Sequence, residues 1–322
     1  MKKRNLGNTG IQVTEIGLGL WAIGGGEWGE VDDRDSLNLI DYAIDAGVNF
    51  FDTSDVYNAG HSERVLGKAM QGRRDRFIVA TKIGWQNFDD RNRVSAYDTV
   101  EKLTAGVETN LERLGTDHID VMQCHINFRE PNMEIFLEGF QKLQRDGKIR
   151  AYGVSTSDFE YLKAFNHDGL CSMLQIDYSI LNRTAEEEIF PYCQANNIST
   201  IIRGPLAMGI LTGKFSLNQA FETGDFRNNW INVPEENAIY RDDLKKVDKL
   251  KGLVIEGRSL AQLAIQFTLR HPAVTTVIPG AKTEMQFSES RAAVDSPPLT
   301  PEELAFIDQI TPPGGGRKIW PA

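Results

Sequence analysis

Eight short apolar runs, spaced along the chain of 322 residues, are the feature that most constrains the fold. They are rich in β-branched residues and nearly continuous rather than alternating, which is typical of parallel strands covered on both faces. The predicted strands occupy residues 15–21, 49–54, 77–84, 119–126, 151–156, 173–179, 199–206 and 275–281. Because helical segments separate them, the pattern predicts an α/β fold, namely one single-domain (β/α)8 TIM barrel over residues 1–322.

The segments between the runs carry helical signals. Two of them place apolar residues at the three- and four-residue spacing of an amphipathic helix. These residues are Val100, Leu103, Val107, Leu111 and Leu114 in one segment, and Met133, Phe136, Leu137, Phe140 and Leu143 in the other. Residues 215–245 are weakly periodic, so we predict an extended loop there, after the seventh strand. The Gly- and Pro-rich residues 311–322 predict a flexible C-terminal tail.

Composition excludes several classes of function. The net charge of −10 argues against nucleic acid or an anionic membrane surface as a partner. No apolar run approaches the roughly 20 residues that span a bilayer, and no apolar segment follows the basic N-terminus as in a signal peptide. The three cysteines are widely spaced, which favours reduced thiols and a cytoplasmic location. The scattered histidines give no metal-binding pair, so we predict no metal and disfavour a metal-dependent hydrolase.

The stretch GLGLWA at 17–22 fits the glycine pattern of a dinucleotide-binding turn. That pattern requires a helix that opens at the second or third glycine. The residues that follow, IGGGEWGE, do not resemble a helix start. We therefore interpret these glycines as bends in the chain at the rim of the barrel.

Four polar residues lie near the carboxyl ends of three successive predicted strands, where barrel enzymes carry their chemistry. They are Asp52 and Tyr57 at the second strand, Lys82 in the third and His125 in the fourth. Each has an ordinary explanation as a buried ion pair, a loop residue or a core residue. Together they indicate a functional site. Burial of the Lys82 ammonium is costly, and an ion pair with Asp52 returns little net stability for it. Buried ionisable groups placed together at the mouth of a barrel are typical of functional sites.

The residue types suggest how such a site acts. A tyrosine with a pKa of about 10 is a weak acid, and an adjacent lysine stabilises its phenolate and lowers that pKa. Asp52 would keep Lys82 charged, while His125 would orient a substrate carbonyl. The four side chains polarise a carbonyl and protonate its oxygen, so a cofactor must supply the hydride.

Several motifs resemble those of the aldo-keto reductase family over residues 2–310. They are FFDTSDVYNAGHSERVLGKAM (50–70), VATKIG (79–84), GKIRAYGVSTSDF (147–159), LQIDYSILNR (174–183), GPLAMGILTGKF (204–215) and IPGAK (278–282). Within the family the chain looks most similar to a bacterial branch that resembles the potassium-channel β-subunits. The resemblance implies that Asp52, Tyr57, Lys82 and His125 form a catalytic tetrad in which Tyr57 is the general acid.

The resemblance also implies that NADPH binds across the mouth of the barrel. A helix that opens near Thr283 would attract an anion at its N-terminus, and Lys282 would pair with a 2′-phosphate. The carboxamide would contact Ser155 and Gln175. The implied cofactor-binding set is Ser155, Gln175, Arg203, Leu206, Gly209, Lys214, Gly280, Lys282, Gln286 and Glu289.

Three positions depart from the family pattern. Thr156 stands where asparagine is usual, and Ser290 replaces an asparagine near the adenine. Arg203 stands where an aromatic ring commonly stacks on the nicotinamide. A guanidinium can also stack, so Arg203 either tunes the nicotinamide, contacts an anionic group or pairs with an acid at the rim. Trp21 and Trp85 are candidates to line the substrate pocket.

Three functions remain open from the sequence. The first is NADPH-dependent reduction of aldehydes or activated ketones. The second is NAD(P)-dependent oxidation of sugars or polyols, because the tetrad runs in either direction. The third is a cofactor-sensing binding subunit with slow turnover. The sequence leaves open the physiological substrate and whether the protein is a monomer or a homo-oligomer.

Overall fold

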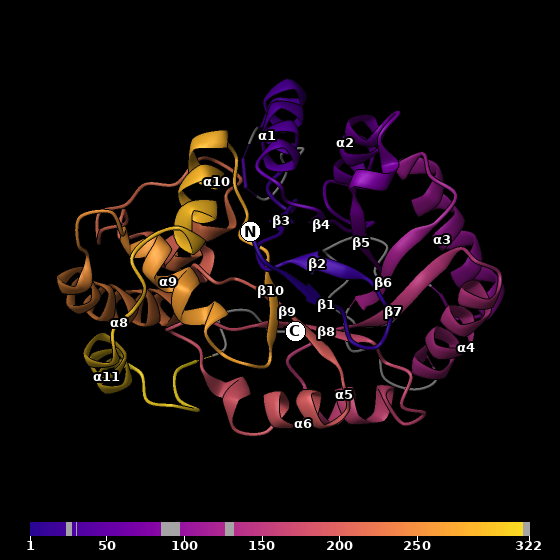
Figure 1. Cartoon of the computed structure of the whole chain (residues 1–322). Helices are drawn as coiled ribbons and strands as arrows, with labels where there is room; N and C mark the ends of the chain where they lie inside the picture. The colour runs from indigo at the N-terminus through magenta and orange to yellow at the C-terminus, as the bar shows by residue number, and fades with distance from the viewer. Residues whose placement is uncertain (24–27, 30, 85–96, 126–131, 318–322) are drawn as a thin grey trace.

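The computed structural model describes residues 1–23, 28–29, 31–84, 97–125 and 132–317. Within them, eight strands form one parallel sheet whose spatial order follows the chain (Figure 1). Each strand falls inside or within two residues of a predicted run. The strands are β3 (Leu18–Gly19), β4 (Phe50–Asp52), β5 (Ile78–Ile83), β6 (Ile119–His125), β7 (Ile149–Ser155), β8 (Met173–Asp177), β9 (Ser199–Arg203) and β10 (Val274–Val277).

Isolated parallel bridges join the first and last strands and close the sheet into a barrel. They pair Ile16 with Val277 and Gly19 with Gly280. A Cβ on Gly17 or Gly19 would lie 2.8 Å from a backbone oxygen of a neighbouring segment, so only glycine permits this approach. The GLGLWA motif therefore serves barrel closure, and among the described residues the next helix begins only at Asp33.

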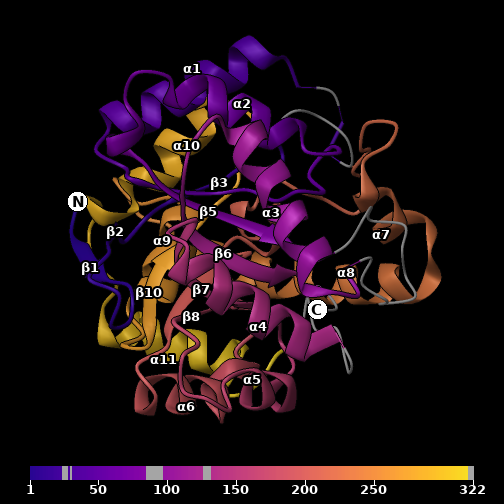
Figure 2. The same ribbon diagram turned by 90° about the vertical axis from the view of Figure 1, so that its right-hand side faces the viewer.

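Helices surround the barrel. Figure 2 shows α3 and α4 side by side over the strands β5 to β7. Both predicted apolar faces point inward, since every residue of the two sets except Val100 is buried. The helices are α1 (Asp33–Asp45), α2 (His61–Met70), α3 (Val100–Leu114), α4 (Asn132–Arg145), α5 (Phe159–Phe165), α6 (Ile189–Ala195), α7 (Asn229–Asn232), α8 (Pro234–Leu250), α9 (Leu260–Leu269), α10 (Glu284–Arg291) and α11 (Pro301–Ile310).

Local capping signals explain several helix boundaries. Thr99 caps α3 by accepting a hydrogen bond from the Lys102 N–H, and Gly115 ends the helix in the left-handed conformation. Ser259 and Gln262 form a capping box at the start of α9.

A short antiparallel hairpin, β1 (Lys3–Asn5) with β2 (Gln12–Thr14), covers the amino-terminal end of the barrel. Figure 1 looks onto this end, with the N-terminus near its centre. Three hairpin residues join one inward-pointing residue from most strands in a separate apolar cluster. Its members are Leu6, Ile11, Val13, Phe50, Ala80, Val121, Ala151, Met173, Ile201 and Ile278. The plugged end leaves the carboxyl ends of the strands as the open mouth.

Two predicted irregular segments contain more structure than expected. The loop predicted at 215–245 includes α7 and the first turns of α8, because Pro234 at the first helical position and the acids after it favour a helix start. The tail predicted as flexible is anchored over residues 311–317. There, Arg183 N–H donates to the Gly315 carbonyl, and Arg317 forms an ion pair with buried Asp243.

The helices of the described chain are all too short or too polar to cross a membrane. The three cysteines are buried and unbridged.

Candidate active site

The four predicted catalytic side chains meet at the open mouth of the barrel. Asp52 is the last residue of β4, Lys82 lies near the end of β5, and His125 ends β6. The parallel register sets neighbouring strand ends side by side, with Asp52 opposite Ala80. Tyr57 returns to this rim on a turn in which Asn58 and Ala59 take left-handed backbone conformations.

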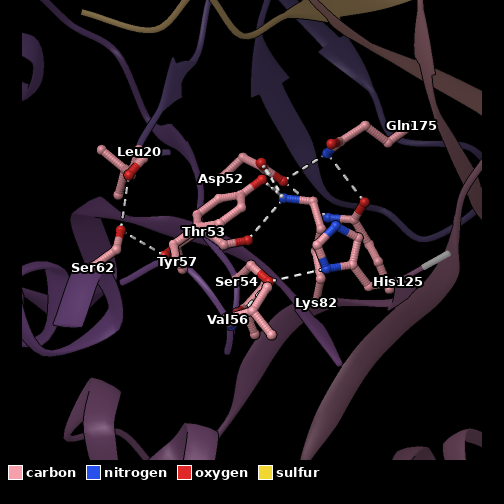
Figure 3. A network of polar contacts seen from close by, with 12 residues as sticks. Leu20, Asp52, Thr53, Ser54, Val56, Tyr57, Ser62, Lys82, His125 and Gln175 are labelled. Atoms are coloured by element: carbon pink, nitrogen blue, oxygen red, sulfur yellow. Dashed lines mark hydrogen bonds and ion pairs between the residues drawn. The ribbon is translucent and has the colours of Figure 1, made fainter. Parts of the chain in front are cut away.

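Lys82 is the centre of this group (Figure 3). Its ammonium donates to Asp52 Oδ1 at 2.6 Å, to the Thr53 carbonyl at 2.9 Å and to Tyr57 OH at 3.0 Å. All three protons of the ammonium therefore have acceptors. The side chain is fully buried, so this geometry is held by packing as well as by charge.

Asp52 is fixed from its other side by two amides. Gln123 and Gln175 donate to Asp52 Oδ2 at 3.0 and 2.7 Å, and Gln175 also donates to the side-chain oxygen of Gln123. The sequence analysis missed Gln123. A signal existed, because Gln123 precedes His125 by two positions in a strand and so faces the same side.

Burial raises the pKa of Tyr57, and this outweighs the opposing effect of the Lys82 charge and hydrogen bond. The pKa of Tyr57 is therefore raised, whereas the sequence predicted that Lys82 would lower it. The difference arises because burial removes water from the phenolate and so disfavours the charged form. Burial alone would lower the pKa of Lys82, but attraction to Asp52 and Tyr57 reverses this and raises it. At neutral pH the phenol is protonated and the amine is charged.

His125 is a neutral imidazole. Burial, reinforced by the positive charges of Lys82 and Arg203, lowers its pKa well below the usual value. Its ring lies edge-on to Tyr57, with centroids 6.2 Å apart. Nδ1 lies 3.1 Å from Ser54 Oγ, which the sequence analysis did not single out.

A cavity of about 490 Å³ opens beside these side chains. Asp52, Tyr57 and His125 line it, and so do Gln286, Glu289 and Ser290 of α10. The whole predicted cofactor-binding set lines it: Ser155, Gln175, Arg203, Leu206, Gly209, Lys214, Gly280, Lys282, Gln286 and Glu289. Lining residues that the sequence analysis missed include Trp28, Met208, Phe215 and Arg227.

Aromatic rings form the wall next to Tyr57. Trp21 stacks on Tyr57 with centroids 6.0 Å apart and on Phe226 with centroids 5.7 Å apart. Trp28 packs edge-on against Trp21 at 5.2 Å. Trp85, the other predicted pocket residue, lies outside the described residues.

Cations outnumber acids in the described lining of the cavity, although the whole chain is acidic. The cations are Arg203, Lys214, Arg227 and Lys282, against Asp52, Glu222 and Glu289. Together with the aromatic surfaces and amide donors of the cavity, these cations fit an anionic dinucleotide. Thr283 caps α10 as predicted, and the Lys282 N–H donates to the Gln286 side chain.

The two lysines predicted to hold cofactor phosphates are paired with acids. Lys282 Nζ lies 3.6 Å from Glu222, which belongs to the loop after β9. Lys214 Nζ lies 3.3 Å from Glu289 of α10. Any phosphate bound by either lysine therefore competes with a carboxylate of the protein itself.

The positions that depart from the family pattern have local partners. Thr156 is buried, and its hydroxyl accepts from the Asp158 N–H. Ser290 donates to the Gln286 carbonyl. In the described part of the chain, no carboxylate lies within ion-pair distance of Arg203, and its guanidinium approaches Ser157 Oγ at 3.5 Å. Burial lowers the pKa of Arg203, and the charge of Asp177, its register partner at the end of β8, opposes this lowering. An acid at the rim therefore still contributes to the surroundings of Arg203.

Comparisons with known proteins identify the family of this chain. The model of the aldo/keto reductase family matches residues 15–312. An aldo-keto reductase of Bacillus subtilis is 33% identical and aligns over 96% of this chain and 93% of its own. An NADH-specific methylglyoxal reductase of Escherichia coli is 31% identical (92% and 94%). A probable voltage-gated potassium channel β-subunit of rice is 31% identical, with 96% of both chains covered.

Solved structures show the same fold. A glycerol dehydrogenase from Gluconobacter oxydans superposes with a TM-score of 0.80 at 31% identity, covering 94% of this chain and 92% of that one. An aldo-keto reductase from Klebsiella pneumoniae in complex with NADPH gives a TM-score of 0.73 at 25% identity, covering 97% and 96%.

Proposed function

The chain belongs to the aldo/keto reductase family of oxidoreductases, and on that premise we propose that it reduces aldehydes or activated ketones with NADPH. The observation that carries the proposal is the position of Lys82. Its ammonium bridges the Asp52 carboxylate and the Tyr57 hydroxyl beside a cavity large enough for a nicotinamide and a small carbonyl compound.

Bound reduced nicotinamide supplies a hydride to the carbonyl carbon. Tyr57 gives its proton to the carbonyl oxygen, and the neighbouring Lys82 charge stabilises the phenolate that remains. Asp52 holds the ammonium in place, with Gln123 and Gln175 fixing the carboxylate in turn. His125, which is neutral, donates a hydrogen bond that orients the carbonyl. Tyr57 keeps its proton at neutral pH, since its pKa is raised.

The residues that would hold the cofactor follow the cavity. Ser155 and Gln175 at the ends of β7 and β8 would contact the carboxamide. Leu206, Gly209 and Lys214 would hold the pyrophosphate, and residues around the start of α10 would hold the adenosine. Arg203, which lines the cavity, would lie against the nicotinamide or an anionic group of the substrate.

Lys282 supports NADPH as the cofactor, because a cation at the adenosine end favours a 2′-phosphate. The structure similar to this chain that was solved with NADPH points the same way. The relative from Escherichia coli is NADH-specific, so we propose the choice of cofactor as a distinct claim. It is tested by measuring the dissociation constants of NADPH and NADH from the quenching of tryptophan fluorescence.

Oxidation of a polyol is a second candidate, favoured by the similarity to a glycerol dehydrogenase. The rice potassium-channel relative keeps a third candidate in view, a cofactor-sensing subunit. The protein's thiols are buried and unbridged, in keeping with the cytoplasmic location that we propose.

The experiment follows the absorbance of reduced nicotinamide with a panel of small aldehydes and, in the reverse direction, glycerol and sugars. We expect Tyr57→Phe to lose turnover by a factor of at least about 10² while NADPH binding persists. Tyr42→Phe, on the outer helix α1, is the matched control. Turnover retained by Tyr57→Phe would refute its role as the acid. Tight cofactor binding without turnover in either direction would favour the sensing subunit.

A further inference from the structure

Ser54 links the predicted active site to a buried carboxyl group that the mechanism does not use. Its hydroxyl oxygen lies 3.1 Å from His125 Nδ1 (Figure 3). The same oxygen lies 2.9 Å from Asp55 Oδ1. The Val56 N–H also donates to the same oxygen, at 3.4 Å. Ser54 is fully buried, and Asp55 is 8% exposed, so water does not substitute for these partners.

A serine hydroxyl has one proton, and this limits how the two contacts form together. If Asp55 is ionised, it only accepts, so Ser54 must donate to it and must accept from His125 Nδ1–H. If Asp55 is protonated, it donates to Ser54, and Ser54 donates to His125 Nδ1. Each arrangement satisfies both contacts, but they place the imidazole proton on different nitrogens.

The position of that proton decides what His125 offers a substrate. A neutral imidazole carries one N–H, and its two nitrogens have opposite roles. When Nδ1 accepts from Ser54, Nε2 carries the proton and donates. When Nδ1 donates, Nε2 only accepts and repels a carbonyl oxygen. The proposed function requires the first state.

The surroundings of Asp55 favour the protonated acid. The charge of Glu63 of α2, which is also buried, acts on the Asp55 carboxyl group, and the Asp55 charge acts in turn on Tyr97 before α3. Arg113 of α3 donates to the backbone carbonyl of Asp55 and forms its ion pair with Glu63 Oε2, not with the Asp55 carboxyl group. Burial, followed by the Glu63 charge, raises the pKa of Asp55 to about 8, against the lowering by Ser54, Arg113 and the Gly84 backbone.

We propose that Asp55, acting through Ser54, is a positioning residue that selects the Nε2–H tautomer of His125 and so makes it a donor to the substrate carbonyl. The proposal rests on the proposed function for its catalytic meaning. The hydrogen-bond relay from Asp55 through Ser54 to His125 fixes the position of one imidazole proton. That position is measured without substrate or cofactor.

The direct test is ¹⁵N–¹H correlation spectroscopy of the full chain labelled in its five histidines, with His125→Asn used to assign the signal. We expect the His125 proton on Nε2 at a pH of about 6.5 and its transfer to Nδ1 as the pH passes through about 8. A proton on Nδ1 already at low pH, or a tautomer that does not change up to a pH of about 9.5, would overturn the proposal.

Variants separate the relay from ordinary packing. Asp55→Asn supplies an amide donor to Ser54 and should hold the Nε2–H form at every pH. Ser54→Ala breaks the connection, so the tautomer should no longer follow the pH. Ser62→Ala is the matched control, since it removes another buried hydroxyl that bonds Thr53 and the Leu20 carbonyl (Figure 3) without touching His125. It should keep the wild-type switch.

Kinetics then connect the tautomer to function. In wild type, kcat/KM for aldehyde reduction should fall about tenfold per pH unit above a pH of about 8. Asp55→Asn should lack this alkaline limb, and Ser54→Ala should lose activity already at neutral pH. The same alkaline limb in wild type and Asp55→Asn would refute the catalytic role of the relay. Absence of turnover alongside a pH-dependent tautomer would refute the proposed function instead, and the two failures are therefore distinguishable.

Discussion

Replacing Lys82 with methionine removes the ammonium from the centre of the candidate active site while keeping most of the side-chain volume. The ammonium is fully buried and has three acceptors, namely the Asp52 carboxylate, the Thr53 carbonyl and the Tyr57 hydroxyl. The substitution therefore leaves a buried carboxylate without its charged partner.

The expected loss of stability follows from the partners that remain. Removing one member of a buried ion pair typically destabilises a protein by about 3–5 kcal/mol, because the other charge stays desolvated. Asp52 keeps two amide donors on Oδ2, from Gln123 and Gln175. We therefore expect the lower end of the range, about 3 kcal/mol. Adding Asp52→Asn to Lys82→Met should recover part of this loss, since the double variant buries no charge.

The assay is urea unfolding followed by tryptophan fluorescence and circular dichroism, with coincident transitions required before a free energy is extracted. Lys142→Met is the matched control, because it breaks an exposed ion pair between Lys142 of α4 and Asp146, the residue that follows this helix. It should leave the midpoint unchanged within error. A loss below about 1 kcal/mol for Lys82→Met, or a double variant less stable than the single one, would refute the reasoning.

Three further predictions concern other parts of the molecule. Gly153→Ala should destabilise the barrel by about 1–3 kcal/mol, because its Cβ would lie 2.0 Å from a backbone oxygen of β8. Gly252→Ala is the control, because the space around Gly252 is open. Equal melting temperatures of the two variants would contradict this prediction. Glu222→Gln should tighten NADPH binding more than NADH binding, because it releases Lys282; unchanged fluorescence titrations would show that the pair does not oppose the phosphate. Burial raises the pKa of Cys171 to about 12, so few thiolates exist at a pH of about 8, and the native protein should react with a disulfide reagent only after unfolding.

Much of the architecture was predictable from local pattern. The apolar runs located all eight barrel strands, because both faces of such a strand are covered and its residues are therefore mostly apolar. The helix faces containing Leu103 and Phe136 followed from spacing alone. Helix α8 was missed because its apolar residues are sparse, and its start depends on Pro234 and the acids after it. The anchoring of residues 311–317 depends on partners such as Asp243, which the composition of the tail does not reveal.

Some features of the candidate site were likewise predictable from the sequence, and others were not. Asp52, Lys82 and His125 were recognisable because a polar residue near the end of an apolar strand is conspicuous, and parallel strands bring their ends to one rim. The direction of the Tyr57 pKa was not recognisable, since it depends on how far desolvation exceeds the effect of Lys82. The sequence shows that Tyr57 and Lys82 are both present, but how deeply each one is buried is determined by the packing of the folded structure.

The sequence by itself determined the closed barrel, the end that carries the candidate site and the types of group gathered there, because these follow from periodicity and from strand direction. Tertiary structure alone decided which groups touch. The pairing of Glu222 with Lys282 joins residues that no periodicity relates. The contacts of Ser54 Oγ with both His125 and Asp55 depend on distances of about 3 Å between strands and turns. Hydrogen bonds and ion pairs act over such short ranges that only the folded coordinates determine them.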